Sequence, residues 1–249
     1  EKDLEHIECY ILNNLIDNYS IPKFSYTKGK PKIPKKIHYC WFGGGDIPEN
    51  LRRCIESWKR YCEDYEILRW DESNYDITKN KYMREAYEEK KWGFVSDYAR
   101  LDILYKEGGI YLDTDVELLK SLDVFLNDEM FCAFINSITV GIGAGIGAVK
   151  GNRLIKELRD CYKNISFRGE DGKLNMTPAN WYIEEVLKNN GYEIENKYQK
   201  KNNMVIYPAG VFVSRDLSYQ KQLVTSKTVA IHHGSGSWHS EDQRKSLCK

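Results

Sequence analysis

Apolar and polar positions follow two periods along the chain, one typical of short buried strands and one typical of amphipathic helices. A β-rich run over residues 36–42 stops at three consecutive glycines, and residues 48–62 then place their apolar side chains on one helical face. A second strand is predicted over 65–70. Strand, glycine loop, helix and strand form a βαβ unit, which binds ligands at the carboxyl ends of its strands. The pattern therefore predicts a ligand beside Trp41, although that loop has no GxGxxG dinucleotide fingerprint.

Two further helices are predicted over 79–90 and 93–107, and the second ends at a pair of glycines that suits a helix cap. Asp97 falls inside the apolar stripe of the second helix, and Arg100 lies about 60° further round. A carboxylate in that position needs a partner, which Arg100 can supply. The two residues form either a structural ion pair or a pair that faces a polar ligand, and the helical spacing leaves both readings open.

The rest of the chain continues to alternate strands and helices, with no internal repeat and no low-complexity segment. This pattern predicts a mixed α/β fold. A helix that opens at Thr177 and Pro178 is expected to use these residues as N-cap and first helical position. The other predicted elements are a helix over 152–163 and strands over 130–135, 204–208 and 228–233.

Residues 1–32 differ in character from the remainder of the chain. Apolar residues at spacings of three and four predict an amphipathic helix over 4–19, and residues 21–36 contain six Lys, three Pro and no acidic residue. This basic stretch is predicted to be a linker, and a solvated connector is favoured over an arm that contacts an anionic membrane surface. We therefore expect an N-terminal helix and basic linker over 1–32 and one domain over 33–249.

Composition excludes several classes of protein. The 249 residues include 37 basic and 37 acidic side chains, so a net charge of zero gives no broad attraction to nucleic acid. The seven cysteines form no CxxC pair and no short-spaced Cys/His cluster, which favours reduced thiols in a reducing compartment. No apolar run approaches the roughly 18 residues of a membrane span. We expect a cytoplasmic protein without a transmembrane segment.

Asp113 and Asp115 follow a short apolar run, 110–112, that has the character of a buried strand. Two aspartates at this spacing are common by chance, so their context carries the weight. In an extended chain the two side chains point the same way, and their charges repel unless a divalent cation lies beside them. Carboxylate oxygens suit Mg²⁺ or Mn²⁺, and such ions keep open positions for phosphate oxygens.

A second polar cluster lies in the stretch "AIHHGSGSW" near the C-terminus. If 228–233 is a strand, His232 and His233 point to opposite faces, and only one of them can serve a given site. Imidazole, hydroxyl and indole groups in one glycine-containing loop could close over a bound anion. Taken alone, ordinary packing is the favoured reading of both histidines.

Three ordered motifs resemble glycosyltransferase family 32: "IPKKIHYCWFGG", "WGFVSDYARLDILYKEGGIYLDTDVELLKSLD" and "IHHGSGSW". The resemblance covers roughly residues 33–240 and extends, more distantly, to the clostridial glucosylating toxins and the fungal Golgi mannosyltransferases. It implies a GT-A fold, in which a Rossmann-like nucleotide-binding half with a mixed central sheet is fused to an acceptor-binding half. It also implies a divalent metal, a nucleotide-sugar donor, and transfer with retention at the anomeric carbon.

The resemblance assigns donor-binding roles to matching residues. Trp41 would stack on the nucleotide base. Asp97 and Arg100 would hold the donor-sugar hydroxyls and the diphosphate, which favours the functional reading of that pair. Tyr111 and Asp113 would contact the donor sugar and the ribose.

The same resemblance implies a metal site with Mn²⁺ or Mg²⁺. Asp115 would be the direct metal ligand beside Asp113, and His232 matches the family's histidine best. Ser237 and Trp238 would close over the β-phosphate. The implied catalytic residues are Asp97, Arg100, Asp113 and Asp115.

The expected function is metal-dependent transfer of a hexose or N-acetylhexosamine to a saccharide or lipid-linked acceptor in surface polysaccharide synthesis, with a UDP-linked donor favoured. Such an enzyme would be cytoplasmic, with peripheral contact at the inner face of the membrane. Two rival readings remain. A haloacid-dehalogenase-type phosphohydrolase also places an Asp-x-Asp after an apolar strand, with the first aspartate as nucleophile. A non-catalytic sugar- or nucleotide-binding module would keep the fold without the reaction.

Residues 139–152 depart from the expected pattern, because Gly143, Gly145 and Ala148 weakly imitate a dinucleotide-binding loop without the preceding βαβ context. We interpret the glycines of 141–147 as small residues that let the backbone approach the donor sugar or the acceptor. Asn180 and Trp181 either line the acceptor side or pack at the start of a helix.

Overall fold

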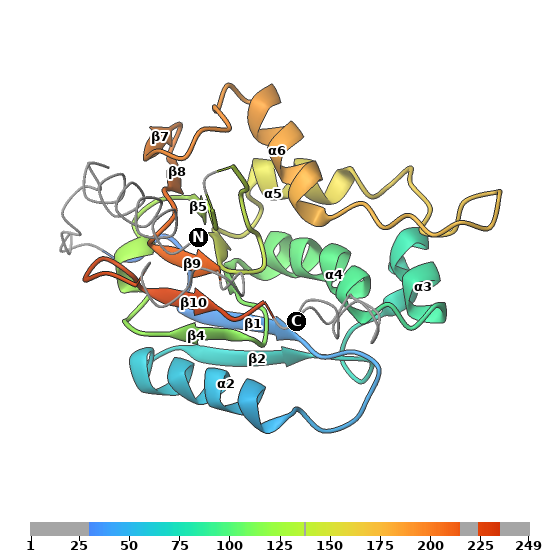
Figure 1. Cartoon of the computed structure of the whole chain (residues 1–249), viewed down its shortest axis with the longest axis horizontal. Coiled ribbons are helices and arrows are strands. Elements are labelled where there is room, and N and C mark those ends of the chain that lie inside the picture. The colour runs from blue at the N-terminus through green and yellow to red at the C-terminus, as the bar shows by residue number, and fades with distance from the viewer. Residues whose placement is uncertain (1–29, 137, 215–223, 235–249) are drawn as a thin grey trace, which may run out of the picture.

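The computed structural model describes residues 30–136, 138–214 and 224–234, which form the predicted mixed α/β fold (Figure 1). The strands of the described residues form two sheets. They are β1 (Lys36–Cys40), β2 (Glu66–Trp70), β3 (Gly109–Tyr111), β4 (Val116–Leu118), β5 (Met130–Ala133), β6 (Ile146–Ala148), β7 (Gln199–Lys201), β8 (Met204–Tyr207), β9 (Phe212–Ser214) and β10 (Ala230–His232).

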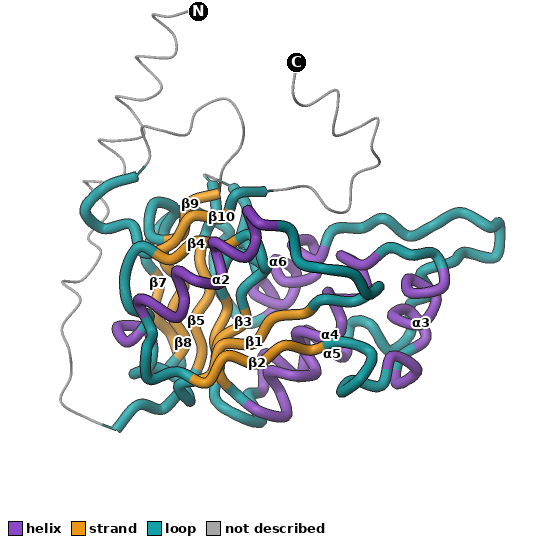
Figure 2. Tube along the Cα trace, turned by 90° about the horizontal axis from the view of Figure 1, so that it is seen from below, coloured by secondary structure: helices purple, strands orange, loops and turns teal. Residues whose placement is uncertain are grey.

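Helices lie on both sides of the larger sheet. They are α2 (Glu49–Tyr61), α3 (Lys81–Glu88), α4 (Trp92–Glu107), α5 (Arg153–Asp160) and α6 (Ala179–Asn189), with short 3₁₀ turns η1 (Ile77–Lys79) and η2 (Asp123–Phe125). Helices α4 and α5 cover one face, and α2 lies on the other side (Figures 1 and 2). The Trp58 indole N–H donates to the Val116 carbonyl oxygen at 2.6 Å, which joins α2 to β4.

The larger sheet has the order β2-β1-β3-β6-β5-β8-β7, and the smaller sheet has the order β4-β10-β9. Strand β1 runs parallel to both of its neighbours, with Ile37 opposite Ile67 on one side and Ile110 on the other. The predicted βαβ unit is therefore confirmed. Because parallel strands end at the same edge of a sheet, the residues after β1 and those after β3 share one edge, where Trp41 and Asp113 begin their loops.

Helix α4 packs against β1, β3 and β6. Its bounds match the predicted ones closely. It ends at Gly108, which takes a φ of +65° and donates its N–H to the Leu104 carbonyl oxygen at 2.9 Å. The helix is buried from Phe94 to Leu104, and this buried part includes three charged residues. They are Asp97, Arg100 and Asp102.

Two local expectations differ from the structure, and the glycine-rich stretch, for which no element was predicted, contributes a strand. Asp113 and Asp115 do not lie in an extended chain, because the Val116 N–H donates to the Asp113 carbonyl oxygen at 3.0 Å and closes a turn between β3 and β4. Helix α6 begins at Ala179, and Pro178 rather than Thr177 occupies its N-cap. The glycine-rich stretch forms a turn followed by β6, which pairs antiparallel with β3 and β5 inside the larger sheet.

Several predictions concern residues outside the described part of the chain. These are the helix over 4–19, most of the basic linker with its membrane contact, and Ser237 and Trp238. The division into 1–32 and 33–249 stays a prediction. Among the described residues, no helix has both the length and the apolar character needed to cross a bilayer. The cysteines of the described residues form no disulfide with one another: Cys40, Cys54, Cys62, Cys132 and Cys161.

Candidate active site

The turn between β3 and β4 carries the two aspartates and is held from two directions. The Asp113 N–H donates to the Gly143 carbonyl oxygen at 2.9 Å, which ties the turn to the glycine-rich stretch. The His233 N–H donates to the Asp115 carbonyl oxygen at 2.9 Å, which ties it to the end of β10. Two segments, 30 and 118 residues further along the chain, therefore fix the turn that carries both carboxylates.

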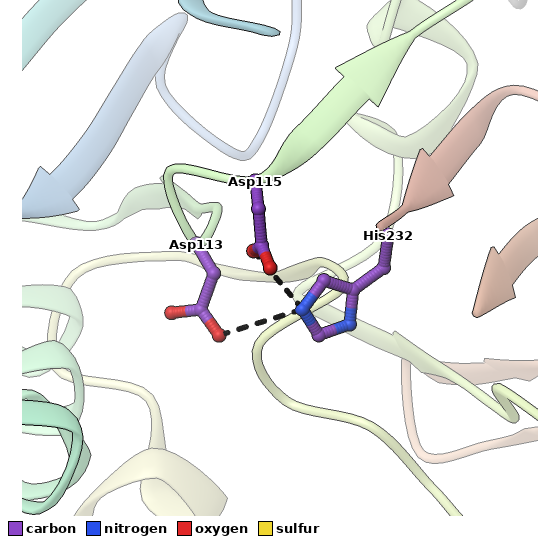
Figure 3. Close-up of side chains that lie close together, drawn as sticks. All are labelled: Asp113, Asp115 and His232. Carbon is purple, nitrogen blue, oxygen red and sulfur yellow. Dashed lines mark ion pairs between the residues drawn. The ribbon is translucent and has the colours of Figure 1, made fainter. Parts of the chain in front are cut away.

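His232 completes a cluster with these aspartates (Figure 3). Strand β10 pairs antiparallel with β4 in a register that places His232 opposite Val116, the residue after the turn. The His232 Nε2 atom lies 3.1 Å from Asp115 Oδ1 and 3.9 Å from Asp113 Oδ2. One ligand atom from each of the three residues lies within 4.8 Å of the others. These side chains converge on one point from a strand and a turn.

The donor set of this cluster fits Mn²⁺ or Mg²⁺. Two carboxylates supply the hard oxygen ligands that Mn²⁺ and Mg²⁺ prefer, and the imidazole adds one nitrogen ligand. Burial lowers the pKa of His232, but the hydrogen bond and the charge of Asp115 outweigh burial, so its pKa is raised. The cluster therefore favours a positive charge at its centre, which the imidazolium or a cation can supply.

Arg100 links the cluster to helix α4. Its Nη2 atom lies 3.0 Å from Asp97 Oδ1 and 3.4 Å from Asp113 Oδ1. The guanidinium lies over the Tyr111 ring at 4.8 Å, and the Tyr111 hydroxyl donates to Asp113 Oδ1 at 3.0 Å. The single positive charge of Arg100 is therefore shared by Asp97 and Asp113, and it cannot fully neutralise both carboxylates.

Asp97 shows the consequence of this sharing. Burial raises the pKa of Asp97 to about 6, although the Arg100 charge acts in the opposite direction. A buried carboxylate with a raised pKa beside a specific charged partner is a candidate for a functional role.

Trp41 lies at the end of β1 on the same edge, in the loop of three glycines. Its indole N–H donates to the Gly45 carbonyl oxygen at 3.1 Å, and the Gly43 N–H donates to Glu72 Oε1 at 2.6 Å. All three glycines of this loop have positive φ values, a conformation that other residues rarely adopt. The loop therefore presents a half-buried Trp41 in a defined orientation beside the site.

Most of the predicted site residues meet at this edge, and the roles assigned to them stay predictions. The structure brings together Asp97, Arg100, Tyr111, Asp113, Asp115 and His232, with Trp41 on the neighbouring loop. His233 points elsewhere, since its Nε2 lies 2.9 Å from Glu117 Oε2. Sequence reasoning missed the contact of Gly143 with Asp113, for which the run of glycines was the only signal.

Comparisons with known proteins point to sugar transfer. Residues 48–132 match the family described as "Glycosyltransferase sugar-binding region containing DXD motif". The chain is 35% identical over 106 residues to Inositol phosphoceramide mannosyltransferase 3 of Schizosaccharomyces pombe, a match that covers 41% of this chain and 30% of that protein. It is 27% identical over 205 residues to Uncharacterized glycosyltransferase L373 of Acanthamoeba polyphaga mimivirus, covering 75% of this chain and 78% of that protein.

A solved structure agrees in fold. The PaToxG Glycosyltransferase superposes with a TM-score of 0.51 at 20% identity, covering 76% of this chain and 80% of that chain. The predicted resemblance and the GT-A fold are therefore confirmed. The chain spans less than a third of the length of the fission-yeast relative.

Proposed function

We propose that this DXD-type glycosyltransferase moves a hexose or N-acetylhexosamine from a nucleotide-sugar donor, with the help of a divalent metal, to a saccharide or lipid-linked acceptor. The observation that carries the proposal is the convergence of Asp113, Asp115 and His232 beside a buried arginine, at the carboxyl edge of a parallel βαβ unit. This arrangement provides anionic ligands for a metal and a fixed cation for a diphosphate in one place.

Each side chain has a role that follows from its chemistry. Arg100 is 5% exposed, and its fixed guanidinium would stabilise the negative charge that develops on the departing diphosphate more strongly than it could in water. Asp97, which is only partly neutralised, would accept hydrogen bonds from donor-sugar hydroxyls. Trp41 would stack on the base, at the strand end where a nucleotide is expected.

Asp113, Asp115 and His232 would hold Mn²⁺ or Mg²⁺, with Asp115 as the direct ligand. When bound, the ion would act as a Lewis acid for the leaving diphosphate. Asp113 contacts both Arg100 and the Tyr111 hydroxyl, so it would also orient the donor between metal and helix α4.

We further propose a UDP-linked donor and retention at the anomeric carbon. No side chain in the described part of the site is placed as an obvious nucleophile activated by a base, so the departing phosphate would take the proton of the acceptor hydroxyl. The acceptor side would include Trp181, which is 56% exposed at the start of α6. The fission-yeast relative is named for a lipid substrate, inositol phosphoceramide, which supports testing lipid-linked as well as saccharide acceptors in the context of surface polysaccharide synthesis.

The test is release of the nucleoside diphosphate from a panel of donors: UDP-glucose, UDP-galactose, the UDP-N-acetylhexosamines and GDP-mannose. Each donor is incubated with Mn²⁺, with Mg²⁺ and with a chelator. Asp115→Asn removes the proposed metal ligand, and Asp64→Asn is the matched control, because Asp64 is exposed and contacts Lys35 away from the site. We expect metal-dependent release from one donor, lost in Asp115→Asn and kept in Asp64→Asn.

Other outcomes would move the assignment. Phosphate release from simple phosphomonoesters, with no nucleotide released from any donor, would favour the phosphohydrolase reading instead. If neither substrate class reacts while calorimetry still detects UDP binding, the chain is either a transferase that lacks its acceptor in the assay or a nucleotide-binding module.

A further inference from the structure

We propose that Gly143 is a positioning residue for the donor site: its bare backbone sets the orientation of the Asp113 carboxylate. The inference deepens the proposed function and rests on the same site. It gives a purpose to the glycine-rich stretch, which pairs inside the sheet and does not form a dinucleotide-binding loop.

Gly143 and Asp113 touch in two ways. The Gly143 carbonyl oxygen accepts the Asp113 N–H at 2.9 Å. A Cβ atom placed on Gly143 would lie 2.0 Å from Asp113 Oδ2 and 3.3 Å from Arg100 Nη1. No real Cβ contact is as short as 2.0 Å, so any side chain at this position must displace the carboxylate or the backbone.

The Asp113 oxygen next to Gly143, Oδ2, is the one that faces the proposed metal ligands Asp115 and His232. Asp113 Oδ1 accepts the Tyr111 hydroxyl at 3.0 Å and lies 3.4 Å from Arg100, whereas Oδ2 is the atom 3.9 Å from His232 Nε2. Gly143 therefore packs against Oδ2 of the carboxylate, and Tyr111 and Arg100 contact Oδ1. A methyl group at 143 would push Oδ2 away from its present place in the cluster.

The need for glycine here comes from space and not from backbone conformation. Gly143 does not share the positive φ of Gly43, Gly44 and Gly45, so alanine can adopt its backbone dihedral angles. Its neighbours in the stretch meet apolar side chains, since a Cβ on Gly145 would lie 2.5 Å from Phe212 Cε1.

This difference supplies a matched pair of variants, Gly143→Ala and Gly145→Ala. Both add one methyl group with severe overlap, but only the first meets the carboxylate. We expect Gly143→Ala to weaken Mn²⁺ binding, measured by calorimetry with UDP present, by about tenfold or more, as loss of a group that orients a metal ligand does. We expect Gly145→Ala to lower the melting temperature and to leave Mn²⁺ affinity within about twofold of wild type.

A double-mutant cycle with Asp113→Ala tests whether Gly143 acts through that carboxylate. Once the carboxylate is removed, Gly143→Ala should lower Mn²⁺ affinity and melting temperature much less than it does in wild type, with only the 3.3 Å approach to Arg100 Nη1 remaining. The effect of Gly145→Ala should stay the same in both backgrounds. If Gly143→Ala does not fold, the Gly143→Ala/Asp113→Ala double variant should fold, because the overlap is gone.

Three results would overturn the inference. Gly143→Ala could fold and bind Mn²⁺ as wild type does, its penalty could persist in the Asp113→Ala background, or the double variant could fail to rescue an unfolded single variant. Failure of the proposed function is separable from these results. If wild type binds no Mn²⁺, the proposed metal site is wrong. The melting temperatures of the single and double variants still show whether Gly143 and Asp113 are coupled.

Discussion

Two buried aspartates on helix α4 show how similar side chains take different roles. Asp97 and Asp102 are 8% and 2% exposed, and they lie little more than one turn apart. Asp102 accepts hydrogen bonds from Lys106, Arg159 and the Tyr75 hydroxyl, and Lys79 lies 3.9 Å away. Asp97 has Arg100 as its cationic partner, and Arg100 also serves Asp113.

The pKa shifts of the two carboxylates have opposite directions. Burial alone would raise the pKa of Asp102, but the hydrogen bonds from Lys106 and Tyr75 outweigh it and lower that pKa. Burial dominates at Asp97 and raises its pKa to about 6. Asp102 is therefore a satisfied structural anion. We propose that Asp97, with fewer cationic partners, remains available to a ligand.

The largest effect is expected for Asp97→Asn. Donor turnover should fall by about 10²- to 10³-fold, because a polar contact to the transition state in a closed site is lost. The variant should be at least as stable as wild type at pH 8, since the neutral amide replaces a carboxylate whose ionisation is disfavoured there. Initial rates of UDP release, measured together with urea unfolding, check both statements. Unchanged turnover would remove Asp97 from the donor site.

Asp102→Asn should show the reverse pattern. We expect a loss of about 3 kcal/mol in the free energy of unfolding at pH 8, because a buried carboxylate with several cationic partners loses its charge. Turnover per folded molecule should change by less than about twofold, since Asp102 faces Tyr75 and Arg159 rather than the donor edge. A large fall in turnover at full folding would contradict the structural role.

Opposite pH dependences should separate the two residues further. The raised pKa of Asp97 means that its ionisation opposes folding above about pH 6 and that this opposition fades as the pH falls from 6 toward 4. The melting-temperature advantage of Asp97→Asn over wild type should therefore be largest at pH 7–8 and disappear on acidification.

The lowered pKa of Asp102 means that its contribution is present above about pH 4 and is lost as the pH falls through its folded-state pKa. The deficit of Asp102→Asn should therefore be constant from pH 8 to 5 and shrink at lower pH. Melting curves of both variants and wild type from pH 8 down to below pH 4 provide the measurement. If the stability differences of the two variants changed with pH in the same way, the proposed difference between Asp97 and Asp102 would be wrong.

The smallest effect is expected for Lys106→Gln. Lys106 is half exposed, and Asp102 keeps Tyr75, Arg159 and Lys79 when it is removed. The free energy of unfolding should fall by no more than about 1 kcal/mol. A loss as large as that of Asp102→Asn would show that Lys106 alone, and not the group of partners, stabilises the carboxylate.

Local patterns predicted much of this architecture. The period of the apolar residues gave α4 within a residue of its bounds, and the glycine pair marked its end correctly. The βαβ unit followed from strand, glycine loop and helix, and it placed Trp41 at the carboxyl end of β1. The helical spacing also brought Asp97 and Arg100 together, because residues three apart on a helix are neighbours.

Features that depend on distant pairing could not be predicted in this way. The choice between His232 and His233 is made by the register of β10 on β4, more than a hundred residues earlier in the chain. The contact of Gly143 with Asp113 requires β6 to lie beside β3. Asp102 received no role from the sequence, since its partners other than Lys106 come from η1, α5 and the loop before η1, and their positions are set by tertiary packing.

The most direct test of the metal-dependent donor site is an anomalous diffraction measurement at the manganese edge, on crystals soaked with Mn²⁺ and UDP. We predict one manganese peak within ligand distance of Asp115 and His232, with the diphosphate of UDP between that peak and Arg100. UDP bound at the end of β1 with no manganese at this cluster, or manganese bound elsewhere, would contradict the proposed site.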